Sequence, residues 1–357
     1  RAHFAFIRNP MYNSRGMNTS ALFGFTNNLL DLLERENPTH VGIAFDTNQP
    51  TFREQEYPEY KANREEQPED IQIATPVVKR MAQAFRIPVL EKPGYEADDL
   101  IGTLAKQAAR EGFEVYMVTP DKDYAQLVEP NIYLMKPARS GKPGELWDMD
   151  TVKKEFDIDE VSQVVDVQGL TGDSVDNIPG VEGIGPKTAG KLIREFGDIE
   201  TLIASTDQLK GKQKAKIEEA SDIALQSKRL ATIDTASPVH FDEAGLKREE
   251  PDDEALKGLL QELEFRSIWR KLYGDSDSSE QQQQEQGDLF QQQQKAEPAQ
   301  PSQPALTTLD QVATDYHLIQ SADDRHAVVR ELQQCEAFAI DTETSGLNPQ
   351  VADLVGI

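Results

Sequence analysis

The sequence predicts an α/β fold, with a mainly parallel sheet flanked by helices, followed by a region that is all helical. Two short runs of apolar, β-branched residues, 39–46 and 113–123, each end in acidic side chains. Segments with the spacing of amphipathic helices lie between them, and from residue 150 to residue 273 the patterns are helical alone. Because strands that alternate with helices pair in parallel, these observations indicate an α/β domain with a helical subdomain after it.

The α/β domain is expected to cover residues 1–150. Its predicted elements, in chain order, are helix 21–37, strand 39–46, helix 73–85, the short strand 87–90, helix 97–112 and strand 113–123. Helix 97–112 carries start and stop signals, because acids fill its first turn and Gly112 closes it. In such a fold the functional site lies at the carboxyl ends of the strands.

The helical subdomain is expected to cover residues 151–273. Amphipathic spacing predicts helices in "MDTVKKEFDI", in "KTAGKLIREFG", and over residues 209–233 and 253–272. Residues 274–312 are rich in Gln and hold few large apolar groups, so we predict a disordered linker there. Residues 313–357 resume strand and helix patterns but are too few for a domain, so we expect the truncated start of one.

Composition limits the function classes. A net charge of −26 argues against binding nucleic acid through overall charge. Cys335 is the only cysteine, which excludes internal disulfides and a cysteine-built zinc site and fits a cytoplasmic protein. The sequence holds no apolar run long enough to span a bilayer. Because the chain begins at Arg1 without Met and ends on an apolar run, we interpret it as a fragment.

Four groups of acidic residues stand at or after the predicted strand ends. They are Asp46; Glu96, Asp98 and Asp99; Asp121 and Asp123; and Asp173 and Asp176. Each like-charge pair at about 4 Å costs on the order of 4 kcal/mol at an intermediate dielectric constant. Two divalent cations would offset this repulsion, and Mg²⁺ prefers carboxylate oxygens. A pair of cations about 4 Å apart can clamp an in-line phosphoryl displacement, with a metal-bound water as the nucleophile.

Each acidic group also has an ordinary structural interpretation. Acids in a helix first turn interact favourably with the helix dipole, so "EADD" alone is more simply a capped surface helix. Asp46 fits a turn, and Asp121 and Asp123 fit the cap of the segment "YAQLV". The placement of all four groups at one end of one predicted sheet favours the metal site.

Several motifs in succession resemble a known nuclease family. They are "VGIAFDTNQPTFREQEYPEYKANR", "GYEADDLIGTLA", "VTPDKDYAQLV" and "GLTGDSVDNIPGVEGIGPKTAGKLI". They resemble the 5′-nuclease domain of bacterial DNA polymerase I, a domain similar to flap endonucleases, and the resemblance runs from Arg1 to about Tyr273. It implies that the eight acids belong to the metal site. Those from Glu96 to Asp121 would lie nearest one metal, and Asp123 and the two later acids on the second side.

The sequence departs from the family pattern in two places. The family begins with a strand that ends in an aspartate, and this chain begins after that strand, so the sheet and the metal site are expected to be incomplete. Pro120 stands where the family has a small residue, and we expect a turn there to tolerate it.

Residues 51–70 are too polar for a core and read simply as an exposed loop. The resemblance places here a helical gateway over a single-stranded 5′ end. Lys61 and Arg64, one helical turn apart, would face the scissile phosphate and stabilise developing charge. Arg1 is a third catalytic candidate by resemblance, and Arg53 is a weaker candidate for binding DNA.

Residues 178–193, "IPGVEGIGPKTAGKLI", resemble a helix-hairpin-helix element, although a Gly-rich turn alone is a weak signal. Free N–H groups at the start of its second helix would bind a phosphate of duplex DNA without reading sequence. The expected contacts are Gly183, Gly185, Lys187 and Thr188, with K⁺ as a further ion at this element. The basic stretch 210–216, "KGKQKAK", would track more backbone.

The stretch 338–348, "FAIDTETSGLN", pairs Asp341 with Glu343 on one face of an extended chain, which suits a shared metal. It resembles the first motif of the 3′–5′ proofreading exonuclease domain that follows the 5′-nuclease. Because further acids of that motif set would lie beyond Ile357, we expect no proofreading activity from this chain. The histidines show no metal-ligand spacing; they are His3, His40, His240, His317 and His326.

The predicted function is that of the N-terminal part of a DNA polymerase I: a 5′–3′ exonuclease and flap endonuclease for primer removal and repair. It would use two or more Mg²⁺ ions, with Mn²⁺ as a substitute. Its partners would be 5′-flap, nicked or primer–template DNA and RNA primers, and it would act as a monomer without a membrane. The alternatives are a stand-alone 5′-nuclease, a noncatalytic module that binds branched DNA, and an α/β phosphatase with an acidic site.

Overall fold

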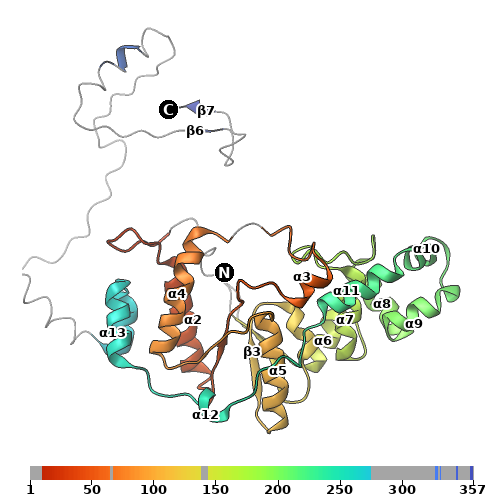
Figure 1. Ribbon diagram of the computed structural model, residues 1–357, viewed down its shortest axis with the longest axis horizontal. Coiled ribbons are helices and arrows are strands. Elements are labelled where there is room, and N and C mark those ends of the chain that lie inside the picture. Colours follow the sequence, from red (N-terminus) through yellow and green to blue (C-terminus); the bar gives the residue numbers. More distant parts are fainter. Residues whose placement is uncertain are drawn as a thin grey trace, which may run out of the picture. The chain divides into compact units, whose positions relative to one another are not determined.

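The computed structural model describes residues 10–64, 67–137 and 144–274, together with 326–328, 330, 343–344 and 354–356. The chain divides into two compact units, Arg1–Gln283 and Gln284–Ile357 (Figure 1). In the described part of the chain, no helix is long and apolar enough to cross a membrane.

Two helices near the start of the chain pack with the last two helices of the first unit. They are α2 (Ser20–Arg35), α4 (Glu69–Ala84), α13 (Asp253–Glu262) and α14 (Arg266–Tyr273). Their buried side chains form one hydrophobic cluster that includes Leu22, Met81, Leu256 and Leu260, and Figure 1 shows α13 beside α4. The expectation of a continuous helical subdomain over residues 151–273 therefore needs correction at its end. The apolar faces of α13 and α14 pack against α2 and α4 instead of against the other helices of this region.

The described strands of the first unit form two small sheets. β1 (Ile43–Ala44) pairs in parallel with β2 (Val89–Leu90), and β3 (Val115–Val118) pairs in parallel with β4 (Ile132–Lys136). β5 (Glu145–Trp147) pairs antiparallel with β4. The predicted parallel pairing is thus confirmed for two pairs, whereas β4 and β5 were not predicted and β1 is shorter than expected. Helix α5 (Ala97–Arg110) contacts both β1 and β3.

The helical region begins at α6 and shares a core with the second sheet. Its helices are α6 (Met149–Phe156), α7 (Val164–Thr171), α8 (Pro186–Phe196), α9 (Ile199–Ala204), α10 (Gly211–Glu219), α11 (Ser221–Ala231) and α12 (Glu243–Leu246), with short 3₁₀ turns η1 (Lys122–Leu127), η2 (Val161–Gln163) and η3 (Thr206–Gln208). Helix α7 packs against α8 and α11. Leu134 of β4, Leu170 of α7 and Ile193 of α8 are all fully buried in this core. The segment 209–233 is broken at Ala220 into α10 and α11.

In the second unit the described residues include one antiparallel pair, β6 (Glu343–Thr344) with β7 (Leu354–Gly356). Glu343 lies in β6, as the predicted strand requires. Asp341 and the predicted linker after Gly274 lie outside the described residues.

Candidate active site

The start of α5 gathers the first carboxylates of the site. Glu96 is the N-cap residue, and its backbone N–H donates to Asp99 Oδ2 at 3.1 Å. Asp46, just after β1, accepts a hydrogen bond from the backbone N–H of Ala97 at 2.8 Å. This hydrogen bond holds Asp46 at the first residue of α5, which lies between Glu96 and Asp98 in the chain.

A second group of carboxylates comes from η1 and from a tight loop after α7. Asp121 caps η1 by accepting the backbone N–H of Asp123 at 3.0 Å. Gln168 of α7 donates from Nε2 to Asp123 Oδ1 at 2.6 Å. In the loop, the backbone groups of Asp173 and Ile178 hydrogen-bond to each other in both directions, at 2.9 and 2.7 Å. This turn presents Asp173 and Asp176 beside η1.

The same loop depends on a glycine at its base. Gly172 has φ of +66°, and a Cβ there would lie 2.4 Å from the carbonyl oxygen of Ile178. Only glycine combines this left-handed backbone with so close an approach of two chain segments. The "TGDSVDNIPG" motif is thus explained by a closed loop that carries two acids.

Burial and neighbouring charges raise the pKa of one carboxyl in each group. Burial, followed by the charge of Glu96, raises the pKa of Asp98 to about 7. Burial, together with the charges of Asp121 and Asp173, raises the pKa of Asp123 to about 7. Negative charge in this region is therefore incompletely compensated by the protein itself.

Tyr124 links the two groups of acids electrostatically. Burial raises the pKa of its phenol, and the charges of Asp98, Asp121 and Asp46 raise it further. The pKa of this one phenol thus depends on carboxylates that follow β1, start α5 and cap η1. Asp173 and Asp176, in the loop after α7, act on Asp123 in the same way. The joint role of the eight acids as metal ligands stays a prediction.

The gateway segment, defined here as residues 57–64, reaches into this acidic site. Lys61 Nζ lies 2.6 Å from Glu96 Oε1 and 3.7 Å from Asp176 Oδ2, and Arg64 forms an ion pair with Asp176. The segment forms turns, and Lys61 has φ of +57°, so the predicted helical spacing is wrong. Both cations nevertheless form ion pairs with acids of the site, and their contact with a phosphate stays a prediction.

Tyr60 and Gln168 also contact acids of the site, and neither residue was predicted from the sequence. The Tyr60 hydroxyl lies 3.2 Å from both Glu96 Oε2 and Asp176 Oδ2, and the ring is 4% exposed. Its pKa is raised by burial and by these two carboxylates, so it remains a donor. Two signals were available: an aromatic residue beside Lys61, and a glutamine inside the apolar stretch "VVDVQGL".

The donor chemistry of the site fits a hard divalent cation. Its ligand atoms are carboxylate oxygens, which Mg²⁺ and Mn²⁺ accept. Within the described residues, however, no three Asp, Glu, His or Cys side chains stand close enough to form a ready-made metal cage. Lys61 and Arg64 explain part of this, because they form ion pairs with Glu96 and Asp176.

Asp99 and Arg53 differ from the expectation for them. Asp99 is fully buried, and each of its oxygens accepts two hydrogen bonds: Oδ1 from Arg53 and the Asp234 backbone, Oδ2 from Arg53 and the Glu96 backbone. Its lone pairs are therefore engaged by protein donors, and its place in the metal site stays a prediction. Arg53 is only 2% exposed, so its predicted contact with DNA is corrected as well.

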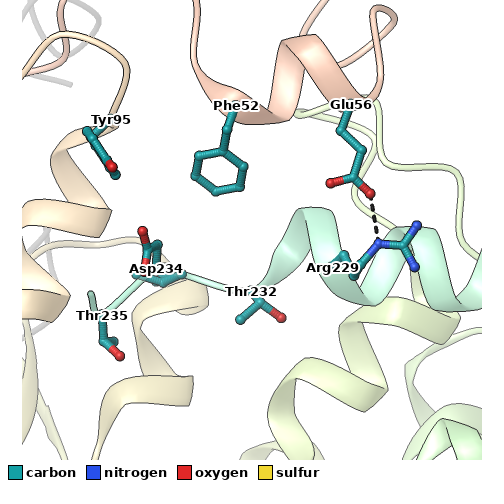
Figure 2. Close-up of a pocket in the computed structure, with 8 residues that line it drawn as sticks. Phe52, Glu56, Tyr95, Arg229, Thr232, Asp234 and Thr235 are labelled. Carbon is teal, nitrogen blue, oxygen red and sulfur yellow. Dashed lines mark hydrogen bonds and ion pairs between the residues drawn. The ribbon is translucent and has the colours of Figure 1, made fainter. Parts of the chain in front are cut away.

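A separate cleft of about 600 Å³ lies beside α3 (Phe52–Glu56) and the end of α11 (Figure 2). Phe52, Tyr95 and Thr232 line it, and Glu56 and Arg229 form an ion pair across its wall, at 2.7 Å. The predicted acids do not line this cleft. It is distinct from the acidic site. Phe52, which lines it, also contacts Arg53, whose guanidinium carbon lies 4.6 Å from the ring centroid.

The predicted DNA-binding turn precedes α8. Gly183 has φ of +73°, Gly185 is the N-cap residue of α8, and Lys187 is exposed in its first turn beside Thr188. Lys216 of α10 donates from Nζ to the Glu182 carbonyl at 2.9 Å, which joins the hairpin to the basic stretch 210–216. Arg1, the third catalytic candidate, lies outside the described residues.

Two family models match this architecture in succession. The 5′-3′ exonuclease N-terminal resolvase-like domain matches residues 1–159, and the 5′-3′ exonuclease C-terminal SAM fold matches residues 160–254. The chain belongs to the 5′–3′ exonuclease family. Its 5′–3′ exonuclease domains are similar to the corresponding part of DNA polymerase I.

Relatives in this family cover the chain to different extents. DNA polymerase I of Bacillus caldotenax is 34% identical over 357 residues, which are 99% of this chain and 40% of that protein. The 5′-3′ exonuclease of Aquifex aeolicus is 36% identical over 264 residues, 74% of this chain and 88% of that protein. The chain thus spans at most about two fifths of the polymerase relatives first matched.

Solved structures agree on the fold. T5 5′-exonuclease with bound zinc matches with a TM-score of 0.52 and 23% identity, over 72% of this chain and 94% of that one. The T5 D15 flap endonuclease in a pseudo-enzyme–product complex with DNA and metal ions matches with a TM-score of 0.53 and 21% identity, over 74% and 97%. Because both structures are less than 25% identical to this chain, the likeness shows the fold alone: a resolvase-like domain followed by a helical domain.

Proposed function

We propose that this domain hydrolyses DNA phosphodiesters with two or more Mg²⁺ ions, as a 5′–3′ exonuclease and flap endonuclease that leaves 5′-phosphate and 3′-hydroxyl ends. The observation that supports this proposal is that carboxylates after β1, at the start of α5 and in η1 all raise the pKa of Tyr124, while those after α7 raise the pKa of Asp123. Lys61 and Arg64 of the gateway segment form ion pairs with two of these carboxylates, Glu96 and Asp176.

The acids divide between two metal positions. Glu96, Asp98 and Asp121 would serve the first position with Asp46 close by, and Asp123, Asp173 and Asp176 the second. Bound cations would supply Lewis-acid stabilisation and a water of lowered pKa for hydrolysis. Mn²⁺ suits the same oxygen ligands.

The protein side chains have their own roles in this reaction. Lys61 and Arg64 would leave their carboxylate partners and orient the scissile phosphate, since both already lie at the acidic site. Gln168 would hold Asp123 in position through its 2.6 Å hydrogen bond. The phenol of Tyr60, shared by Glu96 and Asp176, would keep the two sides of the site in register.

Duplex DNA would bind at the hairpin before α8. Backbone N–H groups at the start of α8, with Lys187 and Thr188, suit one phosphate, and the lysines of residues 210–216 suit the strand beyond it. K⁺ would compete with the Lys216 ammonium for the Glu182 carbonyl. These local contacts let a protein of net charge −26 hold DNA.

The biological role we propose is primer removal and repair within a DNA polymerase I. Its substrates would be 5′-flap, nicked and primer–template DNA, including RNA primers, bound by a monomer in the cytoplasm. The match of a polymerase I relative to 99% of the chain supports this over a stand-alone nuclease. The match to the 5′-3′ exonuclease of Aquifex aeolicus, which covers 88% of that protein, favours the second candidate, a stand-alone nuclease.

The test is cleavage of a 5′-labelled flap by this chain. With Mg²⁺ or Mn²⁺ we expect short labelled products that end in a 3′-hydroxyl, with the new 5′-phosphate on the strand that remains in the duplex. We expect no cleavage after chelation by EDTA. Cleavage that continues at full rate in EDTA would exclude the metal-dependent reaction. An intact flap at saturating Mg²⁺ would exclude the activity itself.

A further inference from the structure

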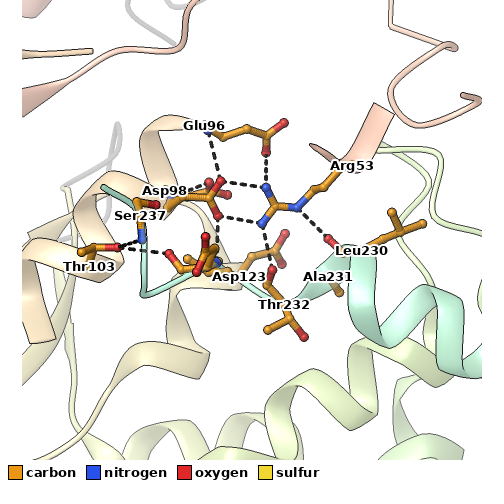
Figure 3. A network of polar contacts seen from close by, with 12 residues as sticks. Arg53, Glu96, Asp98, Thr103, Asp123, Leu230, Ala231, Thr232 and Ser237 are labelled. Atoms are coloured by element: carbon orange, nitrogen blue, oxygen red, sulfur yellow. Dashed lines mark hydrogen bonds and ion pairs between the residues drawn. The ribbon is translucent and has the colours of Figure 1, made fainter. Parts of the chain in front are cut away.

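Arg53 is a buried cation inside a polar stretch of sequence. It lies in α3 and is 2% exposed. Its guanidinium donates to both oxygens of Asp99, at 2.8 and 2.9 Å, and to the carbonyl oxygens of Leu230 and Thr232, at 3.0 and 2.8 Å (Figure 3). The donors of the guanidinium are thus matched to fixed acceptors on two other segments.

Asp99 completes this network from the other side. It accepts the backbone N–H of Glu96 at 3.1 Å and that of Asp234 at 2.8 Å. Three segments therefore meet at one buried ion pair: α3, the start of α5, and residues 230–234 at the end of α11 (Figure 3).

We propose that Arg53 is a positioning residue, which fixes the metal-binding end of α5 in register with the gateway segment. This inference rests on the proposed function of the acidic site. Arg53 Nη1 lies 3.6 Å from Glu96 Oε2, and its partner Asp99 holds the Glu96 backbone. On the other side, α3 leads straight into residues 57–64, which carry Tyr60, Lys61 and Arg64.

The geometry of the pair explains why arginine is required. A guanidinium offers a planar fork that matches a carboxylate with two bonds and leaves further N–H groups for carbonyl oxygens. Lysine keeps the charge but lacks the fork. A buried ion pair of this kind adds little net stability compared with an apolar pair of the same volume, so we assign its main effect to position.

The experiment compares Arg53→Lys and Arg53→Met with a matched control, Asp166→Asn. Asp166 is also a buried carboxylate in an ion pair, 2.6 Å from Lys228, and it accepts the Ile199 backbone N–H at 3.0 Å, inside the helical region. All variants are made in the 357-residue chain. Their melting temperatures show how much stability each substitution removes.

Two readouts separate position from stability. Calorimetry with Mg²⁺ alone should show affinity lowered about 10- to 100-fold in both Arg53 variants, as for other residues that orient metal ligands, and unchanged in the control. Limited trypsin digestion should cut after Lys61 and Arg64 at least several-fold faster in Arg53→Met than in the control. Binding of a 5′-flap with Ca²⁺ in place of Mg²⁺ should remain within a factor of about two, because Arg53 is buried.

Three results would overturn the proposal. The first is loss of flap affinity with unchanged Mg²⁺ affinity, which would return Arg53 to a phosphate contact. The second is a loss of stability equal to that of the control with no change in either readout. The third is full Mg²⁺ affinity in Arg53→Lys. If the unchanged chain bound no Mg²⁺, the proposed function would fail, and the trypsin comparison would still decide whether Arg53 holds the gateway.

Discussion

The acidic site and the hairpin before α8 handle the same anion, a DNA phosphate, by opposite electrostatic means. In the acidic site, burial and then the charges of neighbouring carboxylates raise the pKa values of Asp98 and Asp123. The hairpin presents backbone N–H groups and exposed lysines such as Lys187. One region therefore needs cations before it can approach a phosphate, and the other supplies positive potential itself. Metal and salt should affect the two regions separately.

The largest expected effect is the loss of cleavage when one carboxylate of the acidic site is neutralised. Asp121→Asn removes a charge that faces Asp123, and cleavage should fall by about 1,000-fold, since even residues that only orient metal ligands are worth roughly 10- to 100-fold. Flap affinity should persist. Initial rates on a labelled flap measure this, with Asp150→Asn, an exposed acid in the first turn of α6, as the control. Cleavage by Asp121→Asn at the control rate would contradict the assignment.

The next effect concerns the gateway cation. Lys61→Ala should lower the cleavage rate about 100-fold by removing a donor to the developing charge. It should raise Mg²⁺ affinity a few-fold, because Glu96 loses the ammonium 2.6 Å away. Single-turnover rates and calorimetry separate these opposite changes. Lys79→Ala, which breaks the ion pair between Lys79 on α4 and Glu91 after β2, is the control; equal behaviour of the two variants would refute the role of Lys61.

A smaller effect is expected in the hairpin backbone. Gly183→Ala places a side chain at φ of +73°, where the new Cβ would meet the Lys216 ammonium. We expect a loss of about 1–3 kcal/mol in the free energy of unfolding and weaker flap binding, with the Mg²⁺ affinity unchanged. Chemical denaturation and binding titrations measure these. A change in Mg²⁺ affinity would show that the two regions are coupled.

The smallest expected effect concerns the salt dependence of DNA binding at the hairpin. Lys187→Ala should weaken flap binding uniformly and reduce the dependence of log affinity on log salt by about 1. The rate at saturating DNA should not change. Lys154→Ala removes the same charge from an exposed site on α6 and serves as the control. Identical salt slopes for the two variants would exclude a phosphate contact at Lys187.

The two regions also differ in how far the sequence could predict them. The acids were recognisable because strand ends and the α5 cap have clear signals, and the hairpin because its glycines and Pro186 mark a turn and a helix start. The role of Arg53 could not be read in this way. Its partners, Asp99 and Leu230, lie 46 and 177 residues away, and only tertiary packing shows that its polar segment turns inward.

The fold shows the same division. Local periodicity located α2, α4 and α5, whose apolar faces are regular. It could not show that α13 and α14 return to pack on α2 and α4, because helical spacing carries no information about the partner face. Nor could it show that the gateway residues 57–64 form turns, since polar spacing suits both states.

Anomalous diffraction from crystals grown with Mn²⁺ tests most directly whether carboxylates from four segments share divalent cations. We expect anomalous peaks at about 2.0–2.3 Å from carboxylate oxygens of Glu96, Asp98 or Asp121, and of Asp123, Asp173 or Asp176, with Lys61 displaced from Glu96. Crystals that bind Mn²⁺ elsewhere, with Lys61 and Arg64 still paired to Glu96 and Asp176, would contradict it.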